Sequence, residues 1–203
     1  MKPYNEYCPV AHALDLVGER WSLLLVRELH NGPLRYSDLH DRLPRCSTNV
    51  LATRLRELEA AGVVTRRRLP PPAASTVYEL TATGEALGPV LAALAQWGAR
   101  TLGPPPSDLA ISPGWLEKAL RTTVAAFAPD ARIGFIVGDE QASLDSGVVV
   151  AGLIDDTDAV VSGSPGDLYA LVILGDTRAV AITGDTAAVE RLAAAVAPVQ
   201  PVS

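Results

Sequence analysis

The most constraining feature of the chain is a stretch from Tyr36 to Leu80 that reads YSDLHDRLPRCSTNVLATRLRELEAAGVVTRRRLPPPAASTVYEL. A short helix that Pro44 keeps from extending is followed by a longer helix that Gly62 ends. Two runs of strand-forming residues then flank a loop that contains three consecutive prolines. This order of elements predicts a winged helix-turn-helix, which places one helix in the major groove of DNA and a loop on the flanking backbone.

The longer of these helices is predicted to start at Ser47 or Thr48, either of which can cap it, and to run to about Ala61. Its apolar face carries Leu51, Leu55 and Leu58, the opposite face carries Asn49, Thr53 and Arg56, and Arg54 and Glu57 lie on the flanks. Asparagine, threonine and arginine are side chains that recognise base edges and phosphates. An ordinary solvated helix face would look the same by itself, but the neighbouring elements favour contact with DNA.

The wing is predicted as two strands, Val63–Arg68 and Thr76–Leu80, whose arginines can reach phosphates beside the groove. A solvated edge strand is the alternative. A helix over Ala86–Thr101 follows, with an apolar side made of Leu87, Val90, Leu91, Leu94 and Trp97. After a wing, such a helix usually pairs with its copy in a dimer, although it can also pack on its own domain. Upstream, Val10–His30 predicts two helices separated at Gly18–Arg20.

Charge is distributed unevenly along the 203 residues. The net charge is −6, but residues 1–102 carry +2 and residues 103–203 carry −8. Residues 35–68 contain eight arginines and four acidic residues. The imbalance indicates two domains with different partners. We therefore predict a DNA-binding and dimerisation domain over 1–102, a proline-rich linker over 103–112 and a second domain over 113–203.

The second domain is predicted to combine strands and helices. Helices are expected at Pro113–Phe127, Ser164–Leu174 and Ala187–Ala197, and strands at Ala131–Val137, Gly147–Leu153, Ala159–Val161 and Arg178–Thr183. Runs of strands with helices set apart from them favour an α+β layer over an alternating parallel sheet. The chain as a whole is therefore assigned to the α+β class, with the winged domain first.

Several classes of protein and site are disfavoured. No run of 18 apolar residues suggests a membrane span, and the first residues lack the apolar core of a signal peptide. The two cysteines do not form a motif, which suggests a reducing, cytoplasmic setting. His12, His30 and His40 lack metal-ligand spacing and are better explained as solvated or packed. Without a phosphate-binding glycine loop or a catalytic arrangement, we expect neither an enzyme nor a cofactor.

The first half resembles the HxlR-type winged-helix regulators of bacteria. The matching segments are Cys8–Val10, Gly18–Leu29, Gly32–Leu39, Leu51–Val64 and Tyr78–Gly84. The resemblance implies a homodimeric transcription factor that binds double-stranded DNA at a pseudo-palindromic operator. The residues expected to contact DNA are Arg35, Tyr36, Ser47, Thr48, Asn49, Thr53, Arg54, Arg56, Arg66, Arg67 and Arg68.

Two cysteines bear on this resemblance. In several relatives the cysteine at the position of Cys8 senses oxidants or electrophiles, so Cys8 is a possible redox sensor; packing at the dimer interface is the alternative. Family members commonly enter the recognition helix with an apolar residue and a Ser-Pro pair, where this chain has Cys46, Ser47 and Thr48. Proline is dispensable there, so the helix should form with Cys46 as a small buried residue.

The second half resembles a sterol carrier protein-like domain over roughly residues 110–198. The similar segments are Val160–Leu171 and Gly175–Asp185. That family encloses an apolar cavity, which implies a hydrophobic small-molecule effector here. Leu168, Leu171, Val172, Ile173 and Phe135 could line such a cavity or belong to the plain core.

Together these features predict a ligand-responsive DNA-binding regulator, a repressor, that does not enter membranes. Two rival functions remain open. The chain could be a lipid-binding or structural protein whose winged helix mediates protein contacts. It could also be an accessory protein that has lost DNA binding. Binding to its own upstream DNA that weakens with salt would separate the regulator from both rivals.

Overall fold

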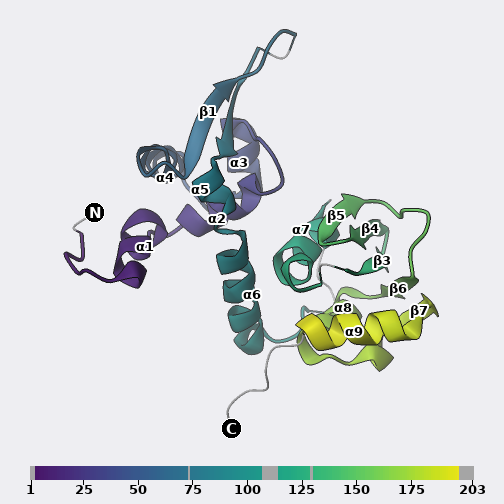
Figure 1. The fold of residues 1–203 in the computed structure, drawn as a ribbon. Helices are drawn as coiled ribbons and strands as arrows, with labels where there is room; N and C mark the ends of the chain where they lie inside the picture. Colours follow the sequence, from purple (N-terminus) through teal and green to yellow (C-terminus); the bar gives the residue numbers. More distant parts are fainter. Residues whose placement is uncertain (1–2, 73, 107–113, 129, 197–203) are drawn as a thin grey trace. The chain divides into compact units, whose positions relative to one another are not determined.

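The chain forms two compact units, residues 1–91 and 92–203, and each is described by itself (Figure 1). The computed structural model describes residues 3–72, 74–106, 114–128 and 130–196. The division between the units falls inside a helix. The predicted linker over 103–112 stays a prediction, and its residues 107–112 lie outside the described residues.

The first unit contains the predicted helices and wing. Its elements are α1 (Pro9–Val17), α2 (Ser22–Leu29), α3 (Tyr36–Arg42), α4 (Thr48–Ala60), β1 (Val64–Arg68), β2 (Thr76–Leu80), α5 (Ala82–Glu85) and the start of α6 (Gly88–Leu102). The break between α1 and α2 falls at the predicted Gly18–Arg20 segment. This arrangement confirms a winged helix-turn-helix in the N-terminal part of the chain.

The helix that follows the wing differs from its prediction. It was expected to begin at Ala86, but α6 begins at Gly88, after the separate one-turn helix α5. Pro89 explains the later start, because a residue without a backbone N–H fits best in the first turn of a helix. Thr81 caps α5, since its Oγ1 accepts a 3.2 Å hydrogen bond from the N–H of Gly84.

The core of the first unit forms around the leucine face of α4. Leu51, Leu55 and Leu58 are at most 1% exposed and lie in one cluster with residues of α2 and α3. The antiparallel β1–β2 hairpin extends away from these helices (Figure 1). Its base is fixed to the segment before α3, because Leu34 and Tyr78 exchange two backbone hydrogen bonds of 3.0 and 2.8 Å.

The second unit is a five-stranded mixed sheet with helices. Its elements after α6 are α7 (Trp115–Thr123), η1 (Ala125–Phe127), β3 (Arg132–Val137), β4 (Glu140–Asp145), β5 (Val148–Ala151), β6 (Ala159–Gly163), α8 (Pro165–Leu174), η2 (Thr177–Ala179), β7 (Ala181–Gly184) and α9 (Thr186–Val196). The strand order is β5-β4-β3-β6-β7, in which only the neighbours β3 and β6 are parallel. Helix α7 packs on β4 and β5, whereas α8 contacts β6 and α9 contacts β6 and β7.

The sequence missed one strand of this sheet and misplaced another. No strand was predicted at β4, yet its residues Ala142, Ser143 and Leu144 are fully buried. The strand predicted from Arg178 begins only at Ala181. Residues 177–179 instead form a 3₁₀ turn after Asp176, whose carboxylate accepts the N–H of Arg178 at 3.1 Å.

Two predicted helices also differ at their ends. The helix expected over residues 113–127 is α7 followed by the 3₁₀ turn η1. The predicted last helix corresponds to α9, and its expected final residue, Ala197, lies outside the described residues, as does Pro113. The predicted helix from Ser164 is confirmed, with Pro165 in its first position.

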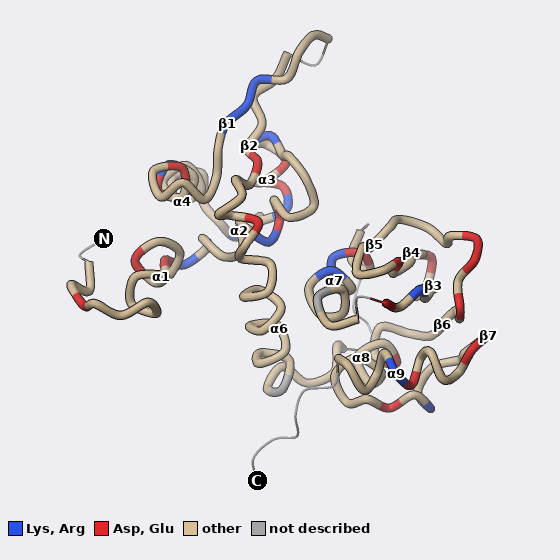
Figure 2. Tube along the Cα trace, viewed as in Figure 1, with Lys and Arg blue, Asp and Glu red and all other residues tan. Residues whose placement is uncertain are grey.

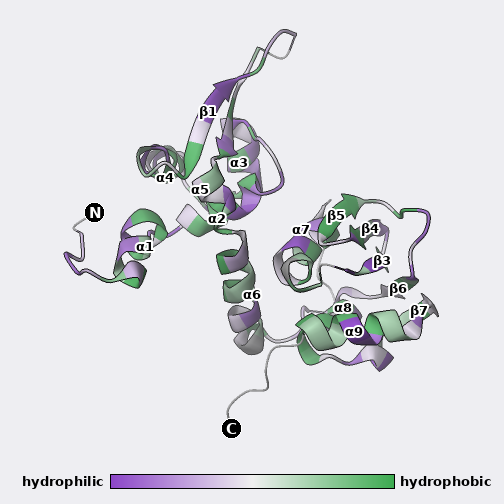
Figure 3. Cartoon of the chain, in the orientation of Figure 1, coloured by the Kyte–Doolittle hydropathy of each residue, from purple (hydrophilic) through white to green (hydrophobic). Residues whose placement is uncertain are grey.

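The core of the second unit lies between its sheet and its helices. Figure 3 shows apolar residues along α8 and α9. Phe135 and Ile133 on the central strand β3 are fully buried. Between them, a Cβ at Gly134 would lie 2.8 Å from a methyl carbon of Leu153, so glycine permits this close approach. Within the described ranges, no helix is long and apolar enough to cross a membrane. A sterol carrier-like fold is not shown by this arrangement.

Candidate nucleic-acid interface

Helix α4 presents a polar face on the side opposite its buried leucines. Asn49 and Arg56 are exposed and Thr53 is partly exposed, in agreement with the helical periodicity of the sequence. We call Asn49, Thr53 and Arg56 the recognition face. The guanidinium of Arg56 lies along the helix, where Nη2 donates to Thr53 Oγ1 at 3.1 Å and Nε donates to the carbonyl of Ala52 at 3.3 Å. Neither partner is charged, so the positive charge of Arg56 is not neutralised there.

The first turn of α4 is accessible and is held by α3. Ser47 occupies the N-cap position, as predicted, but its side chain makes no capping hydrogen bond. Ser47 and Thr48 are both exposed. The hydroxyl of Tyr36 donates to the carbonyl of Thr48 at 2.8 Å. Tyr36 therefore positions the start of α4, a role that the sequence did not reveal.

Arg54 is held inside the first unit. Its side chain is 18% exposed and lies 2.9 Å from the carboxylate of Glu19, with a second ion pair to Glu57 on the next turn. Glu19 belongs to the segment between α1 and α2. Arg54 therefore joins α4 to this segment, and its flanking position on the helix wheel reflects a packing role.

Two of the three wing arginines are also paired with carboxylates. Arg66 Nε lies 2.8 Å from Glu59 Oε1, which connects β1 to α4. Arg67 donates to both carboxylate oxygens of Glu79 at 2.8–2.9 Å across the hairpin. Hydrogen bonding from Arg67 lowers the pKa of Glu79. Both arginines remain about half exposed, so their other N–H groups are still accessible.

Four arginines of the basic segment have no carboxylate partner among the described residues. They are Arg35, Arg45, Arg56 and Arg68, and all four are exposed. Figure 2 shows positive residues along β1 and around α3. Arg45 lies in the turn before α4 and was not among the predicted contacts. Its position two residues before the N-cap could have indicated it, because the first turn of a recognition helix lies nearest the DNA.

The two cysteines occupy different environments. Cys46 is 1% exposed, as predicted for a small core residue, and burial raises the pKa of its thiol. Cys8 is partly exposed and lies at the N-cap of α1. Both thiols are free. The sensing role of Cys8 stays a prediction. The described part of the chain holds no cluster of three His, Cys, Asp or Glu side chains that could bind a metal ion.

Comparison with known proteins identifies the family. A family model described as HxlR-like helix-turn-helix matches residues 16–105. The HTH-type transcriptional regulator sll1512 of Synechocystis is 43% identical over 91 residues, which cover 45% of this chain and 67% of that protein. The regulator YvaP of Bacillus subtilis is 39% identical over 101 residues, covering 49% and 94%. The solved structure of reduced YodB from B. subtilis is 34% identical, covers 48% of this chain and 96% of that chain, and has a TM-score of 0.43.

The family match ends at residue 105, within the segment that follows α6. The winged-helix unit therefore accounts for most of the matched residues, whereas the mixed sheet of the second unit lies beyond them. The polar face of α4 and the wing, which the geometry above describes, fall inside the match. This chain belongs to the HxlR-like helix-turn-helix family of transcriptional regulators.

Proposed function

We propose that this protein is a homodimeric transcriptional repressor that inserts α4 into the major groove of an operator. The recognition face carries this proposal, because Asn49, Thr53 and Arg56 are accessible on the side opposite the buried leucines. An asparagine amide pairs with adenine, an arginine pairs with guanine, and a threonine can contact either base edge. The exposed hydroxyls of Ser47 and Thr48, at the helix N-terminus, suit a phosphate or a base edge.

The unpaired arginines supply the contacts to the DNA backbone in this proposal. Arg45 precedes α4, Arg35 precedes α3 and Arg68 lies on the wing. Because none of them must first leave a carboxylate, each can neutralise a phosphate without losing an ion pair. Arg66 and Arg67 can add contacts through their remaining N–H groups. Arg54 contributes by holding α4 in place.

The proposed dimer forms through α6. Val90, Leu94 and Trp97 are separated by four and three residues, and therefore share one side of the helix. We call them the dimer stripe. All three are exposed, and Trp97 is 70% exposed. By contrast, Leu87 and Leu91, predicted on the same apolar side, pack against the core of the first unit. A second copy covering the dimer stripe would remove this apolar surface from water and would match a pseudo-palindromic operator.

DNA binding is tested by fluorescence anisotropy with the DNA upstream of the protein's own gene, over a series of salt concentrations. If Arg35, Arg45 and Arg68 of both protomers each neutralise one phosphate, the log–log slope should be about −5.4 or steeper. Arg56→Ala should weaken specific binding by about 1–3 kcal/mol for each half-site and relax specificity at one base pair of each half-site. A flat salt response would instead support a lipid-binding or protein-contact function. A reporter under the bound promoter tests repression, which requires the protein to lower transcription.

Dimerisation is tested separately by sedimentation. Trp97→Glu should shift the protein toward monomer, because a charge would be buried in the proposed interface. Trp97→Phe is the matched control and should stay dimeric. If Trp97→Glu sedimented like the parent dimer, α6 would not form the interface.

A further inference from the structure

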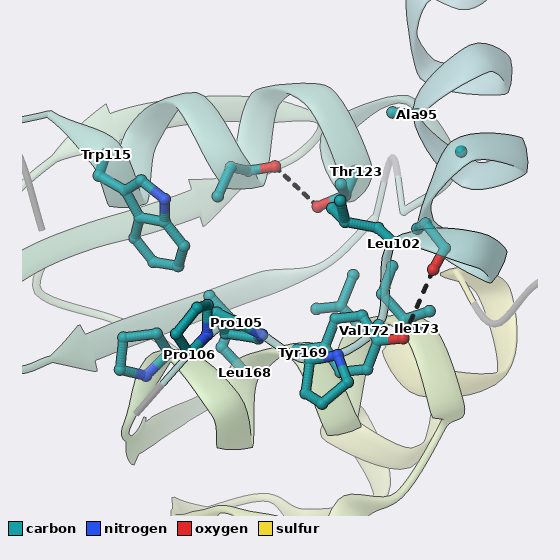
Figure 4. A pocket seen from close by; sticks show the side chains of 16 residues that line it. Ala95, Leu102, Pro105, Pro106, Trp115, Thr123, Leu168, Tyr169, Val172 and Ile173 are labelled. Atoms are coloured by element: carbon teal, nitrogen blue, oxygen red, sulfur yellow. Dashed lines mark hydrogen bonds between the residues drawn. The ribbon is translucent and has the colours of Figure 1, made fainter. Parts of the chain in front are cut away.

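The second unit contains an apolar cavity of about 600 Å³. Its walls come from three helices and one connecting segment (Figure 4). Helix α6 contributes Ala95 and Gly98, α7 contributes Trp115, and α8 contributes Tyr169, while Pro104–Pro106 line a further part. Every lining residue belongs to residues 92–203, so the cavity lies within one compact unit. Its volume is in the range of sites for drug-sized ligands.

The lining restricts the chemistry of a ligand. Among the described residues that line the cavity, none is charged. In this described part of the lining, side-chain hydroxyls come from Thr123 and Tyr169, and both already donate to backbone carbonyls, at 2.7 Å to Ala119 and 3.4 Å to Ala99. A charged ligand would lose its hydration without gaining a partner of opposite charge among these residues, which is costly. The two hydroxyl oxygens can still accept a hydrogen bond, and the long bond of Tyr169 can be exchanged for one to a ligand.

Small residues on the helices create the space. Ala95, Gly98 and Ala99 lie on the α6 wall, and Ala119 lies on α7. A Cβ added at Gly98 would meet no atom within 4 Å. The five residues that the sequence left between pocket and core all belong to the buried core cluster, and three of them, Leu168, Val172 and Ile173, also line the cavity.

The cavity also shares α6 with the dimer stripe. Ala95, Gly98 and Ala99 lie roughly 120° around the helix from the centre of the stripe at 100° per residue. One side of α6 therefore faces the cavity while another side carries Val90, Leu94 and Trp97. A molecule bound in the cavity would contact α6, the same helix that is proposed to form the dimer interface.

We propose that this cavity binds an uncharged, predominantly apolar organic molecule with at most a hydroxyl or carbonyl group, and that its occupancy changes DNA affinity through α6. The regulatory part of this inference rests on the proposed function. An effector shifts DNA binding only if it binds the two arrangements of the protein with different affinities. By linkage, DNA must then change the affinity for the effector by the same factor.

The first experiment needs no DNA and uses two dyes with one skeleton. N-phenyl-1-naphthylamine is neutral, whereas 8-anilinonaphthalene-1-sulfonate carries a sulfonate. Titrated into the full chain, the neutral dye should show saturable fluorescence enhancement with one site per chain. The anionic dye should bind at least about tenfold more weakly, a difference of about 1.4 kcal/mol. No saturable binding, or equal binding of both dyes, would overturn the proposal.

Substitutions at one position locate the dye. Gly98→Leu should fill the cavity and reduce neutral-dye affinity by at least about tenfold, while thermal melting shows that the protein remains folded. Gly98→Ala is the matched control, because it adds one methyl group in open space and should keep the affinity within about threefold. If Gly98→Leu does not fold, Ala119→Leu fills the cavity from α7. Unchanged affinity in a folded, filled variant would place the dye elsewhere and contradict the inference.

The second experiment adds operator DNA. Saturating neutral dye should change the affinity of the parent for DNA by at least about fivefold, and Gly98→Leu should lose this response. Unchanged DNA affinity with dye bound would overturn the regulatory part and leave the binding site. If the protein bound no DNA under any condition, the proposed function would fail, while the dye titrations would still decide the ligand site.

Discussion

The candidate binding sites of the two units lie in opposite environments, one at a polar surface and one in an apolar cavity. In the first unit the candidate contacts are polar, exposed and largely positive, whereas the second unit contains an apolar cavity and residues 103–203 carry a net charge of −8 (Figure 2). A polyanion such as DNA must be met at the surface, because it cannot enter a protein core. An apolar small molecule gains free energy only by leaving water. The difference shows that residues of a surface site can be close together in the sequence. The residues that line an apolar cavity come from distant parts of the sequence and meet only in the folded chain.

The largest expected effect tests whether the two units fail separately. Phe135→Ala should destabilise the second unit by about 3–5 kcal/mol, because a fully buried ring is lost from the central strand. Leu55→Ala should destabilise the first unit by about 2–5 kcal/mol. Calorimetry measures both losses. Neutral-dye binding should fall in Phe135→Ala, and DNA binding should fall in Leu55→Ala.

Measuring the activity of the unsubstituted unit in each variant tests whether the two functions belong to separate units. Phe135→Ala should retain parental DNA affinity at a temperature where the first unit is folded, and Leu55→Ala should retain dye binding. If either substitution abolished both activities at a temperature where the other unit is intact, the functions would not be divided as proposed.

The next effect concerns the two cysteines of the first unit. Cys46 is buried with a raised pKa, whereas Cys8 is partly exposed. A thiol reacts as its thiolate, and a buried one reacts only after local opening. We expect iodoacetamide at pH 8 to alkylate Cys8 at least about tenfold faster than Cys46.

Peptide mass spectrometry measures the two alkylation rates, and Cys8→Ser provides the control for assignment. Loss of DNA binding on alkylation of Cys8, but not in Cys8→Ser, would support a sensor. Equal rates at the two thiols would contradict the described burial. Unchanged DNA binding after complete alkylation of Cys8 would favour a packing role.

The accuracy of the sequence-based predictions also differs between the two units, and the first unit was predicted more completely. The recognition helix could be predicted because its leucines repeat at helical spacing and Ser47 and Gly62 mark its ends. The wing strands could be predicted in the same way, because the signal for each strand lies in its own residues. The ion pairs of Arg54 and Arg67 could not be predicted, because Glu19 and Glu79 reach them only after folding. The structure therefore favours Arg45 and Arg68 over the paired arginines as candidates for phosphate contacts.

In the second unit, local signals succeeded where apolar runs mark the strands β3, β5 and β6, and where single residues fix a helix end. Ser164 and Pro165 fixed the start of α8, but β4 was missed because its burial comes from distant elements that pack on it, such as α7, rather than from its own composition. The cavity was expected only through a resemblance, and its lining could not be assigned. Ala95, Trp115 and Tyr169 meet there from distant parts of the sequence.

A smaller effect separates free from paired arginines on the wing. Arg68→Ala should weaken DNA binding roughly tenfold and reduce the salt slope by about 0.9 for each protomer, because a phosphate contact is lost. The double variant Arg67→Ala/Glu79→Ala removes an internal pair without changing net charge, and should cost less than about threefold. Anisotropy on operator and unrelated DNA measures both, and the Arg68 effect should be independent of sequence. Equal losses in the two variants would show that Arg67 also contacts phosphate.

The smallest effect lies at the start of α8, which forms one wall of the cavity. Ser164 Oγ accepts the N–H of Asp167 at 3.2 Å, and Asp167 Oδ2 accepts the N–H of Ser164 at 2.8 Å. Ser164→Ala should cost about 1 kcal/mol, measured by denaturant unfolding, since one capping bond is lost. The backbone N–H of Ser164, and secondly its hydroxyl, lower the pKa of Asp167.

The lowered pKa of Asp167 fixes the direction of the pH dependence. A carboxylate with a depressed pKa in the folded state stabilises the protein above its unfolded value, here 3.8, and loses that contribution as pH falls through the folded value. The stability difference between the parent and Asp167→Asn should therefore be full at pH 7 and shrink below pH 3.8. A difference that grew on acidification would contradict the capping geometry. Neutral-dye affinity should barely change at pH 7, because the cap orders the end of α8 while Leu168, Tyr169 and Val172 form the wall.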